Sequence, residues 1–453
     1  MHNLTTDHSS IPRLADCSQF EQTLRICLVN NLPFRVASAM ESVRTCDDIA
    51  GGCMWLSRLG MTICAATISL SPLAHTVLGP SEHIDDLKAD PTGIYAFIIR
   101  GDNKALVAAQ QLKVEDTGIG PPVSLPLIDG VALALKAADA TALAQQPGIV
   151  QVWYVPRPLF GTYVHVIQSF QYIETMAKPP EPVNLSLGPP GEVMPLNSHI
   201  EEPMNEATRR MSARGFIIVF AAGNYYNSIA PNPGVINPWC LPEWVICVGA
   251  ARPDLKGLWS GSARGKSEDP STWPDVVANG VDVLSAWPAA TPKTLDQKEH
   301  DEASELFRKK IPKEKWNEFS LMSGTSQATA QVTRAVSQVA YFIQQAILAH
   351  PSAQLGQPLF SITIPQDRLA ATGHKLRLTG DLGAKTADGV VITYRWVEPW
   401  RLIKQILIDT AIPMKDNSPG EVGAGFVSPE YIDRQFGQYG RAPVAILPVK
   451  ALP

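Results

Sequence analysis

From about residue 92, short apolar runs alternate with longer stretches in which apolar residues recur at helical spacing. The clearest apolar runs, which we interpret as buried strands, are residues 93–99, 148–155, 183–187, 215–222 and 244–251. Helices are predicted between them, beginning near Val131, Val164 and Ile200. This alternation is typical of an α/β fold in which helices cover both faces of a mostly parallel sheet.

The longest helix is predicted after Ser326, where apolar residues recur every three or four positions as far as Ile343. Two stretches interrupt the alternation. Residues 287–318 are rich in Pro, Lys and Glu and read as a surface insertion with a short helix. Residues 349–392 contain two alternating runs around a Gly/Asp-rich turn, which predicts a hairpin, and residues 398–411 form an amphipathic pattern.

The composition mainly excludes certain classes of partner and site. The chain has 453 residues, of which 45% are hydrophobic and 18% charged, as in an ordinary globular protein with a large core. A net charge of -5, spread without long runs of one sign, argues against nucleic acid or an anionic membrane surface as partner. Five of the seven cysteines lie before residue 65, and only Cys240 and Cys247 follow, so the spacing predicts neither a disulfide framework nor a zinc site.

Residues 54–76 are the one candidate targeting segment. Arg58 precedes an apolar run that ends in small residues and Pro72, the layout of a signal peptide, and the run is too short to span a membrane. If Met54 is the true start, we expect an exported protein, periplasmic or secreted, without stable membrane insertion. Otherwise the segment is a buried helix of a cytoplasmic protein, and residues 1–53 are an N-terminal extension of uncertain status.

Residues 319–330, FSLMSGTSQATA, hold the strongest candidate for chemistry. Ser326 follows a tight Gly324-Thr325 turn and begins the long predicted helix. The unpaired N–H groups and the positive dipole end at a helix N-terminus can stabilise an oxyanion, so the position suits a nucleophile.

Several strand ends carry motifs in a recognisable order: VNLSLG, GFIIVFAAGN, VGAA, WSGSARG with PDVVANGVDVLSA, SGTSQATA, and QILIDTA with GAGFVSP. In order and approximate spacing they resemble the subtilisin-like serine peptidases. The resemblance implies a three-layer α/β fold over residues 92–432, with insertions at 287–318 and 349–392 and a tail at 433–453. It also makes an extended peptide or protein segment the expected partner.

The resemblance assigns roles to single residues. Ser326 corresponds to the nucleophile, and Asn224 to the side chain that donates to the oxyanion. A carboxamide suits that task because its N–H can point at developing negative charge. The substrate-binding positions that the resemblance implies are Ser186, Leu187, Gly188 and Gly223. No cofactor is expected; calcium is possible by analogy with the family, but no site for it is identifiable.

The match fails for the family's aspartate, at the end of the first strand, and its histidine, at the head of the next helix, because no His-Gly-Thr-His pattern occurs. Asp116-Thr117-Gly118 copies the aspartate turn, but the preceding QQLKVE is too polar for a buried strand, and we interpret the match as accidental. Placing residues 93–99 as the first strand puts Arg100 at the aspartate position and Asp129, 29 residues later, at the histidine position.

On this alignment Ser326 lacks an imidazole, and a serine hydroxyl needs a positioned base to be a useful nucleophile near neutral pH. Asp129 would be a weak base, or would form a structural ion pair with Arg100. His165 and His199 are expected to border the groove rather than the nucleophile. The loop that carries His199, with Glu201 and Glu202, is expected to shape or cover that groove.

The leading hypothesis is therefore a catalytically impaired peptidase or a peptide-binding pseudopeptidase, so enzymatic activity is uncertain. One alternative is an active serine endopeptidase that uses Asp129 or His199 as an unusual base. Another is a structural protein on the same fold.

Overall fold

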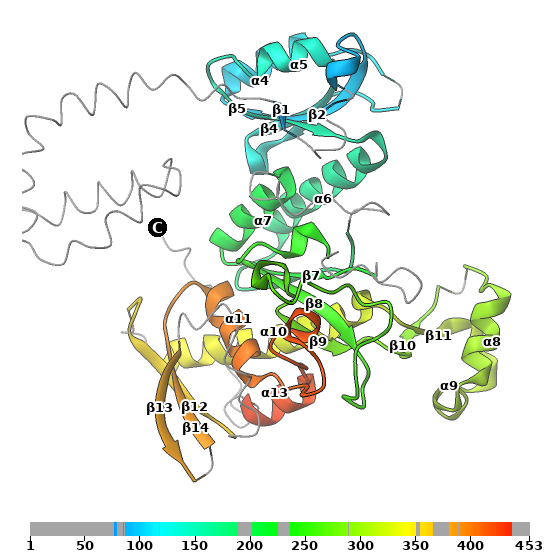
Figure 1. The fold of residues 1–453 in the computed structure, drawn as a ribbon, viewed down its shortest axis with the longest axis vertical. Helices are drawn as coiled ribbons and strands as arrows, with labels where there is room; N and C mark the ends of the chain where they lie inside the picture. Colours follow the sequence, from blue (N-terminus) through cyan, green and yellow to red (C-terminus); the bar gives the residue numbers. More distant parts are fainter. Residues whose placement is uncertain are drawn as a thin grey trace, which may run out of the picture. The chain divides into compact units, whose positions relative to one another are not determined.

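The computed structural model describes residues 77–78, 85, 87–116, 118–188, 202–224, 236–288, 290–349, 354–365, 380–387 and 389–436. Two main sheets organise this part of the chain, one parallel and one mostly antiparallel (Figure 1). The predicted signal segment, residues 54–76, and the tail, residues 433–453, lie outside the described residues except for the end of the last helix. No helix of the described part combines the length and apolar character that membrane crossing requires.

The parallel sheet has the strand order β6-β7-β8-β9. Its strands are β6 (Pro182–Leu185), β7 (Ile217–Ala221), β8 (Val245–Ala251) and β9 (Val276–Asn279). All neighbouring strands run parallel, and β7 and β8 are buried along their whole length. Strands that are buried on both faces read as continuous apolar runs, which is why the sequence located them.

Helices cover both faces of this sheet. The helices α6 (Arg157–Met176) and α7 (Pro203–Ala213) share one core with Ile218 and Phe220 of β7. On the opposite face, α10 (Thr325–Ala349) and α11 (Pro399–Thr410) pack with Ile217 and Val219 of the same strand. Alternate residues of a strand point to opposite faces, so one apolar strand supports both helix layers. The expected three-layer α/β fold is present in this region.

The second sheet has the order β1-β5-β2-β4-β3. Its strands are β1 (Val77–Leu78), β2 (Ile94–Gly101), β3 (Val123–Leu125), β4 (Gly130–Lys136) and β5 (Ile149–Val155). β2 pairs antiparallel with both β4 and β5, and β3 with β4. With α4 (Asn103–Gln111) after β2 and α5 (Ala137–Leu143) after β4, residues 94–155 follow the βαββαβ order of ferredoxin-like units.

Two expectations for this region were wrong. Residues 93–99 do not form the first strand of the parallel sheet, because β2 belongs to the antiparallel one. The helix predicted from Val131 begins only at Ala137, and its first half is strand β4. Every residue of β4 except Lys136 is buried, so the strand carries no polar alternation that would separate it from a buried helix.

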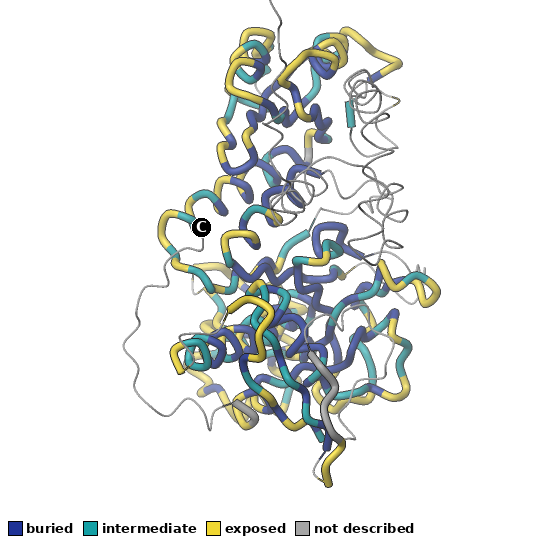
Figure 2. The backbone as a smooth tube through the Cα atoms, turned by 90° about the vertical axis from the view of Figure 1, so that its left-hand side faces the viewer, coloured by how far each residue is buried: buried dark blue, intermediate teal, exposed yellow. Residues whose placement is uncertain are grey.

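Both faces of the antiparallel sheet are covered. Phe97 and Ile99 of β2 face a core that includes residues of α4 and α5. Ala96 and Ile98 face the core that contains Tyr163 of α6. Since α6 and α7 also pack on the parallel sheet, they form the helix layer that both sheets use. Figure 2 shows the buried backbone running through these layers while exposed residues lie mainly at the helix surfaces and loops.

The two interruptions hold separate small elements. β10 (Val283–Ala286) and β11 (Phe319–Met322) form an antiparallel pair, and α8 (Leu295–Ala303) and α9 (Glu305–Lys310) lie between them. A three-stranded antiparallel sheet follows α10, in the order β12-β14-β13. It contains β12 (Pro358–Ile364), β13 (Gly380–Thr386) and β14 (Gly389–Arg395), and the β13–β14 hairpin confirms the predicted one. In the described part of the chain, β14 is followed by α11, α12 (Pro419–Val422) and α13 (Pro429–Phe436).

Candidate functional site

Ser326 lies in the first turn of α10, directly after β11 and a short turn. Backbone contact fixes this turn, because the N–H of Gly324 donates to the carbonyl of Gly280 at 2.8 Å. A Cβ at Gly280 would lie 2.6 Å from the Gly324 oxygen and 2.6 Å from the Cβ of Ala250. Only glycine permits this approach, so Gly280 sets the position from which α10 starts.

The Ser326 hydroxyl is hydrogen-bonded to the backbone. Its Oγ donates to the carbonyl oxygen of Ser186 at 3.3 Å, and the Ser186 hydroxyl donates to the carbonyl of Ser326 at 2.9 Å. The Ser186 hydroxyl also accepts from Nδ2 of Asn184 in β6 at 3.0 Å. The structure therefore joins the predicted nucleophile to the predicted substrate-binding segment, 140 residues away in the sequence.

Asn224 follows β7 and lies against the same turn. Its Oδ1 accepts from the backbone N–H of Thr325 at 3.0 Å and from the Thr325 hydroxyl at 2.8 Å. The Thr325 hydroxyl in turn accepts from the backbone N–H of Gly223 at 3.1 Å. With Oδ1 fixed in this way, Nδ2 lies near Gly324, where a Cβ would be 3.4 Å from it. The role of Asn224 as an oxyanion donor stays a prediction.

Asn237 supports the substrate-binding segment from behind. Its Nδ2 donates to the carbonyls of Leu187 at 3.1 Å and Ala221 at 2.8 Å, and its backbone N–H donates to Ala222 at 2.8 Å. One fully buried carboxamide thus links the end of β6 to the end of β7. Sequence reasoning missed Asn237, although an asparagine before Pro238 in an otherwise apolar stretch was a possible signal.

No hydrogen bond among the described residues connects a histidine to Ser326. His165 is exposed on α6. His300 of α8 pairs with Oδ1 of Asp282 at 3.2 Å, and this carboxylate also accepts from the Ser323 hydroxyl at 3.3 Å. His199 lies outside the described residues.

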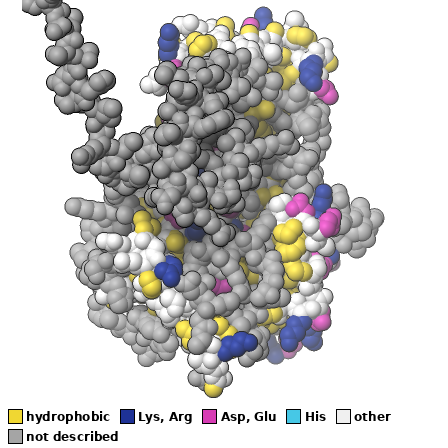
Figure 3. Space-filling view, turned by 60° about the vertical axis from the view of Figure 1, so that its left-hand side comes forward, with side chains coloured by type: hydrophobic (Ala, Val, Ile, Leu, Met, Phe, Trp, Pro, Cys, Tyr) yellow, Lys and Arg dark blue, Asp and Glu magenta, His cyan; other side chains and the backbone are white. Residues whose placement is uncertain are grey.

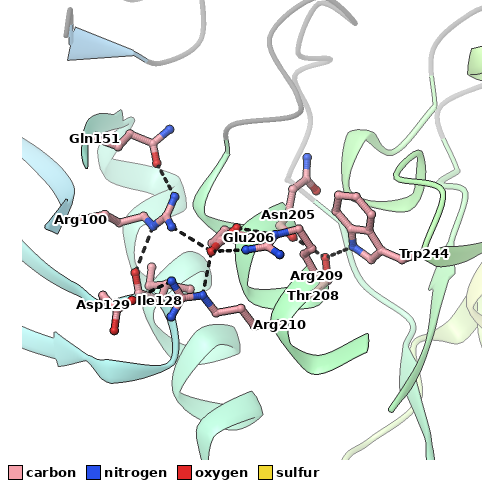
Figure 4. A network of polar contacts seen from close by, with 10 residues as sticks. All are labelled: Arg100, Ile128, Asp129, Gln151, Asn205, Glu206, Thr208, Arg209, Arg210 and Trp244. Atoms are coloured by element: carbon pink, nitrogen blue, oxygen red, sulfur yellow. Dashed lines mark hydrogen bonds and ion pairs between the residues drawn. The ribbon is translucent and has the colours of Figure 1, made fainter. Parts of the chain in front are cut away.

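Arg100 and Asp129 belong to a different cluster (Figure 4). Arg100 at the end of β2 donates to Oε1 of Glu206 on α7 at 2.9 Å and to the carbonyl of Ile128 at 3.0 Å. Asp129 accepts from Arg210 of α7 at 2.7 Å, and Arg210 also bonds Glu206 at 2.7 Å. Each therefore has its ion-pair partner on α7 and not in the other. The cluster connects the antiparallel sheet to α7.

The expected setting of Asp129 was wrong. It does not begin a helix but precedes β4, in the left-handed backbone region with φ of 49°. None of its hydrogen bonds or ion pairs reaches Ser326, whose helix α10 packs on the other face of the parallel sheet from α7. Asp116 also lies outside this site, because it follows α4 and pairs with Arg157. This agrees with the interpretation of its motif match as accidental.

The Arg100 cluster pairs three arginines, Arg100, Arg209 and Arg210, with the two carboxylates of Glu206 and Asp129. Burial opposes ionisation of Glu206, but hydrogen bonds from Arg209 and Arg210 and the nearby charge of Arg100 outweigh it, and the pKa of Glu206 is lowered. Burial is also the main cause of a lowered pKa at Arg100, while Glu206 opposes it. A cavity of about 420 Å³ opens beside Arg100 and Arg210.

Two further observations bear on the site. The described residues contain no group of three or more His, Cys, Asp or Glu side chains placed to hold a metal ion. Cys240 and Cys247, for which the spacing predicted no partner, form a disulfide beside β8, and both are 1% exposed. The pairing depends on η4 (Pro238–Cys240) folding back to the strand, which is not visible in the sequence.

Comparison with known proteins shows similarity to one family over part of the chain. Residues 155–352 match the model of the subtilase family, a match that begins where the antiparallel unit ends. A search of curated protein sequences gave no significant match. A lanthipeptide protease structure is 14% identical with a TM-score of 0.36, over 60% of this chain and 66% of that one.

The prenylagaramide maturation protease PagA is 13% identical with a TM-score of 0.34, over 60% of this chain and 67% of the other. Sphericase is 21% identical with a TM-score of 0.24, over 41% and 47%. This chain thus spans about two thirds of the first two proteases, and similarity at this level carries no inference about activity. Residues 155–352, which carry Ser326, Asn224 and Ser186, are similar to the subtilase family.

Proposed function

We propose that this subtilase homologue binds an extended peptide and is catalytically impaired. The observation that supports the proposal is the environment of Ser326, whose hydroxyl donates to the Ser186 carbonyl while Asn224 bonds the neighbouring Thr325. A serine without a positioned base is a poor nucleophile. Residues 94–155, which include the positions where the family resemblance placed the aspartate and the histidine, form the antiparallel unit instead.

The end of β6 favours peptide binding. β6 is the edge strand of the described parallel sheet, and it leads directly into Ser186, Leu187 and Gly188. An edge strand offers unpaired backbone groups, to which an extended peptide can add as a further strand. The Ser186 and Leu187 carbonyls already accept one hydrogen bond each, but a carbonyl oxygen has two lone pairs and can accept a second.

A protein or peptide segment is the proposed partner, and nucleic acid is not. The net charge of -5 disfavours phosphate binding. On the face drawn in Figure 3, the described Lys and Arg side chains are interspersed with Asp and Glu and form no continuous basic surface.

A fluorophosphonate probe tests the catalytic half of the proposal. At pH 7 we expect Ser326 to be labelled at least ~10³-fold more slowly than an active subtilase, because loss of the base alone costs subtilisin about 10⁶ in kcat. In-gel fluorescence measures the rate, with a Ser326→Ala variant as the background. Stoichiometric labelling that the Ser326→Ala change abolishes would support an active endopeptidase and contradict the proposal.

Peptide binding is tested separately. A library of fluorescent extended octapeptides should give saturable anisotropy changes, and Ser186→Pro should weaken the binding at least ~10-fold by altering the backbone beside β6. Leu295→Ser, at an exposed position on α8, is the control and should bind as the parent does. If no peptide binds, the peptide-binding half of the proposal is wrong.

We also propose that the chain is exported, as residues 54–76 suggested. Cys240 and Cys247 form a disulfide, and disulfides persist mainly in oxidising compartments. We expect both cysteines to resist alkylation in denaturant until a reductant is added, as peptide mass mapping would show. Reduction should lower the free energy of unfolding by about 2 kcal/mol, the loop-closure contribution of a short crosslink. Free thiols in protein purified from its native compartment would argue for a cytoplasmic location.

A further inference from the structure

The cavity beside the Arg100 cluster has no part in the proposed function. Its volume is about 420 Å³, and its walls come from the end of β2, the start of α4, the turn before β4, the start of β5, and Arg210 of α7. Small-molecule sites commonly measure about 300 to 1,000 Å³, so the cavity is large enough for a small ligand.

The cluster that forms one wall has one guanidinium more than it has carboxylates. Glu206 accepts from Arg100 at 2.9 Å and from Arg210 at 2.7 Å (Figure 4). It also accepts from Arg209 at 2.8 Å, and Asp129, which pairs with Arg210, is the second carboxylate. Burial is the largest cause of the lowered pKa of Arg100, and the charges of Arg210 and Arg209 lower it further. A negative group beside these arginines would offset that repulsion.

The cavity also offers hydrogen-bond donors. Arg210 uses Nε for Glu206 and Nη2 for Asp129, whereas its Nη1 bonds no described residue. Asn103, the first residue of α4, lines the cavity, and no hydrogen bond from its backbone N–H or that of Lys104 is formed within the described structure. The first N–H groups of a helix lack partners within the helix, and the partial positive charge there favours an anion.

One acidic side chain of the lining opposes an anion. Asp102 is the N-cap of α4, where its Oδ1 accepts from the N–H of Ala105 at 2.8 Å and its Oδ2 lies against Gly148. Asp102 is exposed, so water and salt screen its charge. The side chains of Arg100 and Arg210 are only 13% and 24% exposed, and charges in such partly buried places interact more strongly. The two arginines therefore outweigh Asp102.

Apolar surface lies beside the charged wall. Ile128, which is fully buried, and Val150, which is exposed, both line the cavity. An inorganic ion would leave this surface in water, whereas an organic molecule would cover it, and burial of apolar surface is favourable.

We propose that the cavity binds a small organic anion, whose carboxylate or phosphate group pairs with Arg210 and Arg100 and whose apolar part covers Val150. A guanidinium suits either group because its planar N–H donors match two oxygens at once. The site shares no residue with the Ser326 site or with residues 186–188, so its test is independent of the proposed function.

Isothermal titration calorimetry of the whole chain at pH 7 tests this site with matched probes. We expect hexanoate or hexyl phosphate to bind at one saturable site with a Kd below about 1 mM, and the tighter of the two identifies the preferred anionic group. Hexanamide and hexylamine, which carry no negative charge, should bind at least ~10-fold more weakly than the better anion. Acetate and inorganic phosphate, which lack the alkyl chain, should be weaker by a similar factor.

Variants of two arginines on α7 provide a matched pair. Arg210→Gln should weaken binding of the better anion at least ~10-fold, because it removes a charged donor from the cavity. Arg209→Gln removes the same charge and another hydrogen bond to Glu206, but Arg209 does not line the cavity, and affinity should stay within about threefold of the parent. Asp102→Asn keeps a side chain that caps helices well and should tighten binding, since it removes the opposing charge and leaves the arginines unchanged.

Three results would overturn the proposal. The first is equal binding of hexanoate, hexyl phosphate and hexanamide, or no saturable binding by any of them. The second is an equal loss of affinity in Arg209→Gln and Arg210→Gln. The third is weaker binding in Asp102→Asn, which would indicate a ligand that presents a positive group to the cavity. If acetate or inorganic phosphate bound as tightly as its hexyl counterpart, the site would take an inorganic or minimal anion and the role of Val150 would be wrong.

Discussion

Replacing Glu206 with Gln is expected to lower the free energy of unfolding by about 3 to 5 kcal/mol. Glu206 accepts from Arg100, Arg209 and Arg210, and its side chain is only 11% exposed. Removing one partner of a buried ion pair leaves an uncompensated charge, here the guanidinium of Arg100, whose side chain is 13% exposed. Urea denaturation followed by tryptophan fluorescence would measure the change, and a cost below about 1 kcal/mol would contradict it.

A surface pair provides the control. Arg214 and Glu174 lie 3.0 Å apart with side chains 43% and 35% exposed, so Glu174→Gln should cost less than about 1 kcal/mol. The pH dependence has a definite sign. Because the pKa of Glu206 is lowered in the folded state, its stabilisation is complete above its ordinary pKa of 4.5 and is lost as the pH falls through the folded-state pKa. The parent and Glu206→Gln should therefore converge in stability in acid.

The elements that were predicted correctly are those with a strong local pattern of apolar residues. The helix after Ser326 was predicted from its apolar spacing and is α10, and the apolar runs at 215–222 and 244–251 contain β7 and β8. The apolar face of α10 packs on residues of β7 and β8, so in these segments the local pattern and the tertiary environment agree. The hairpin at β13 and β14 was predicted for the same reason.

The antiparallel unit could not be predicted in this way. An apolar run indicates that a strand is buried but does not indicate which strand it pairs with. The sequence of β2 therefore fitted a parallel sheet as well as an antiparallel one. In β4, Ala and Leu have high helix propensity, but the layer between α4, α5 and α6 imposes a strand. The wrong helix at Val131 then gave Asp129 the histidine position at the head of a helix. The candidate role of Arg100 depended on the other error, the placement of residues 93–99 as the first strand of the parallel sheet.

At the site, the sequence located the residues at strand ends but not what lies behind them. Ser326, Asn224 and Ser186 each follow a recognisable strand motif, and the structure brings them together. Asn237 and Glu202 support that group through hydrogen bonds between segments far apart in the chain. No local pattern encodes such contacts, and Glu202 was noticed only as part of a loop expected to border the groove.

The insertion at 287–318 is hydrogen-bonded to β11, the strand that leads to Ser326. Asp301 of α8 accepts from the backbone N–H of Leu321 in β11 at 2.8 Å and from the Ser320 hydroxyl at 3.0 Å. It also pairs with Lys293 at 2.6 Å, and both side chains are at most 3% exposed. Lys293 donates in addition to the carbonyls of Trp316 and Phe319. Hydrogen bonds outweigh burial at Asp301 and lower its pKa, so the carboxyl is ionised and the insertion is fixed to β11 by charge.

Asp301→Ala should accordingly lower the free energy of unfolding by about 3 to 5 kcal/mol, because the Lys293 ammonium would stay buried without its counter-ion. The double variant Lys293→Met with Asp301→Leu should recover a large part of this loss, since replacing a buried pair with apolar side chains is often neutral. Glu305→Ala breaks the surface ion pair between Glu305 and Lys309, whose side chains are 71% and 72% exposed respectively. This change should alter the free energy of unfolding by less than about 0.5 kcal/mol. If the double variant were no more stable than Asp301→Ala, the loss would come from the broken hydrogen bonds to β11 rather than from the uncompensated charge.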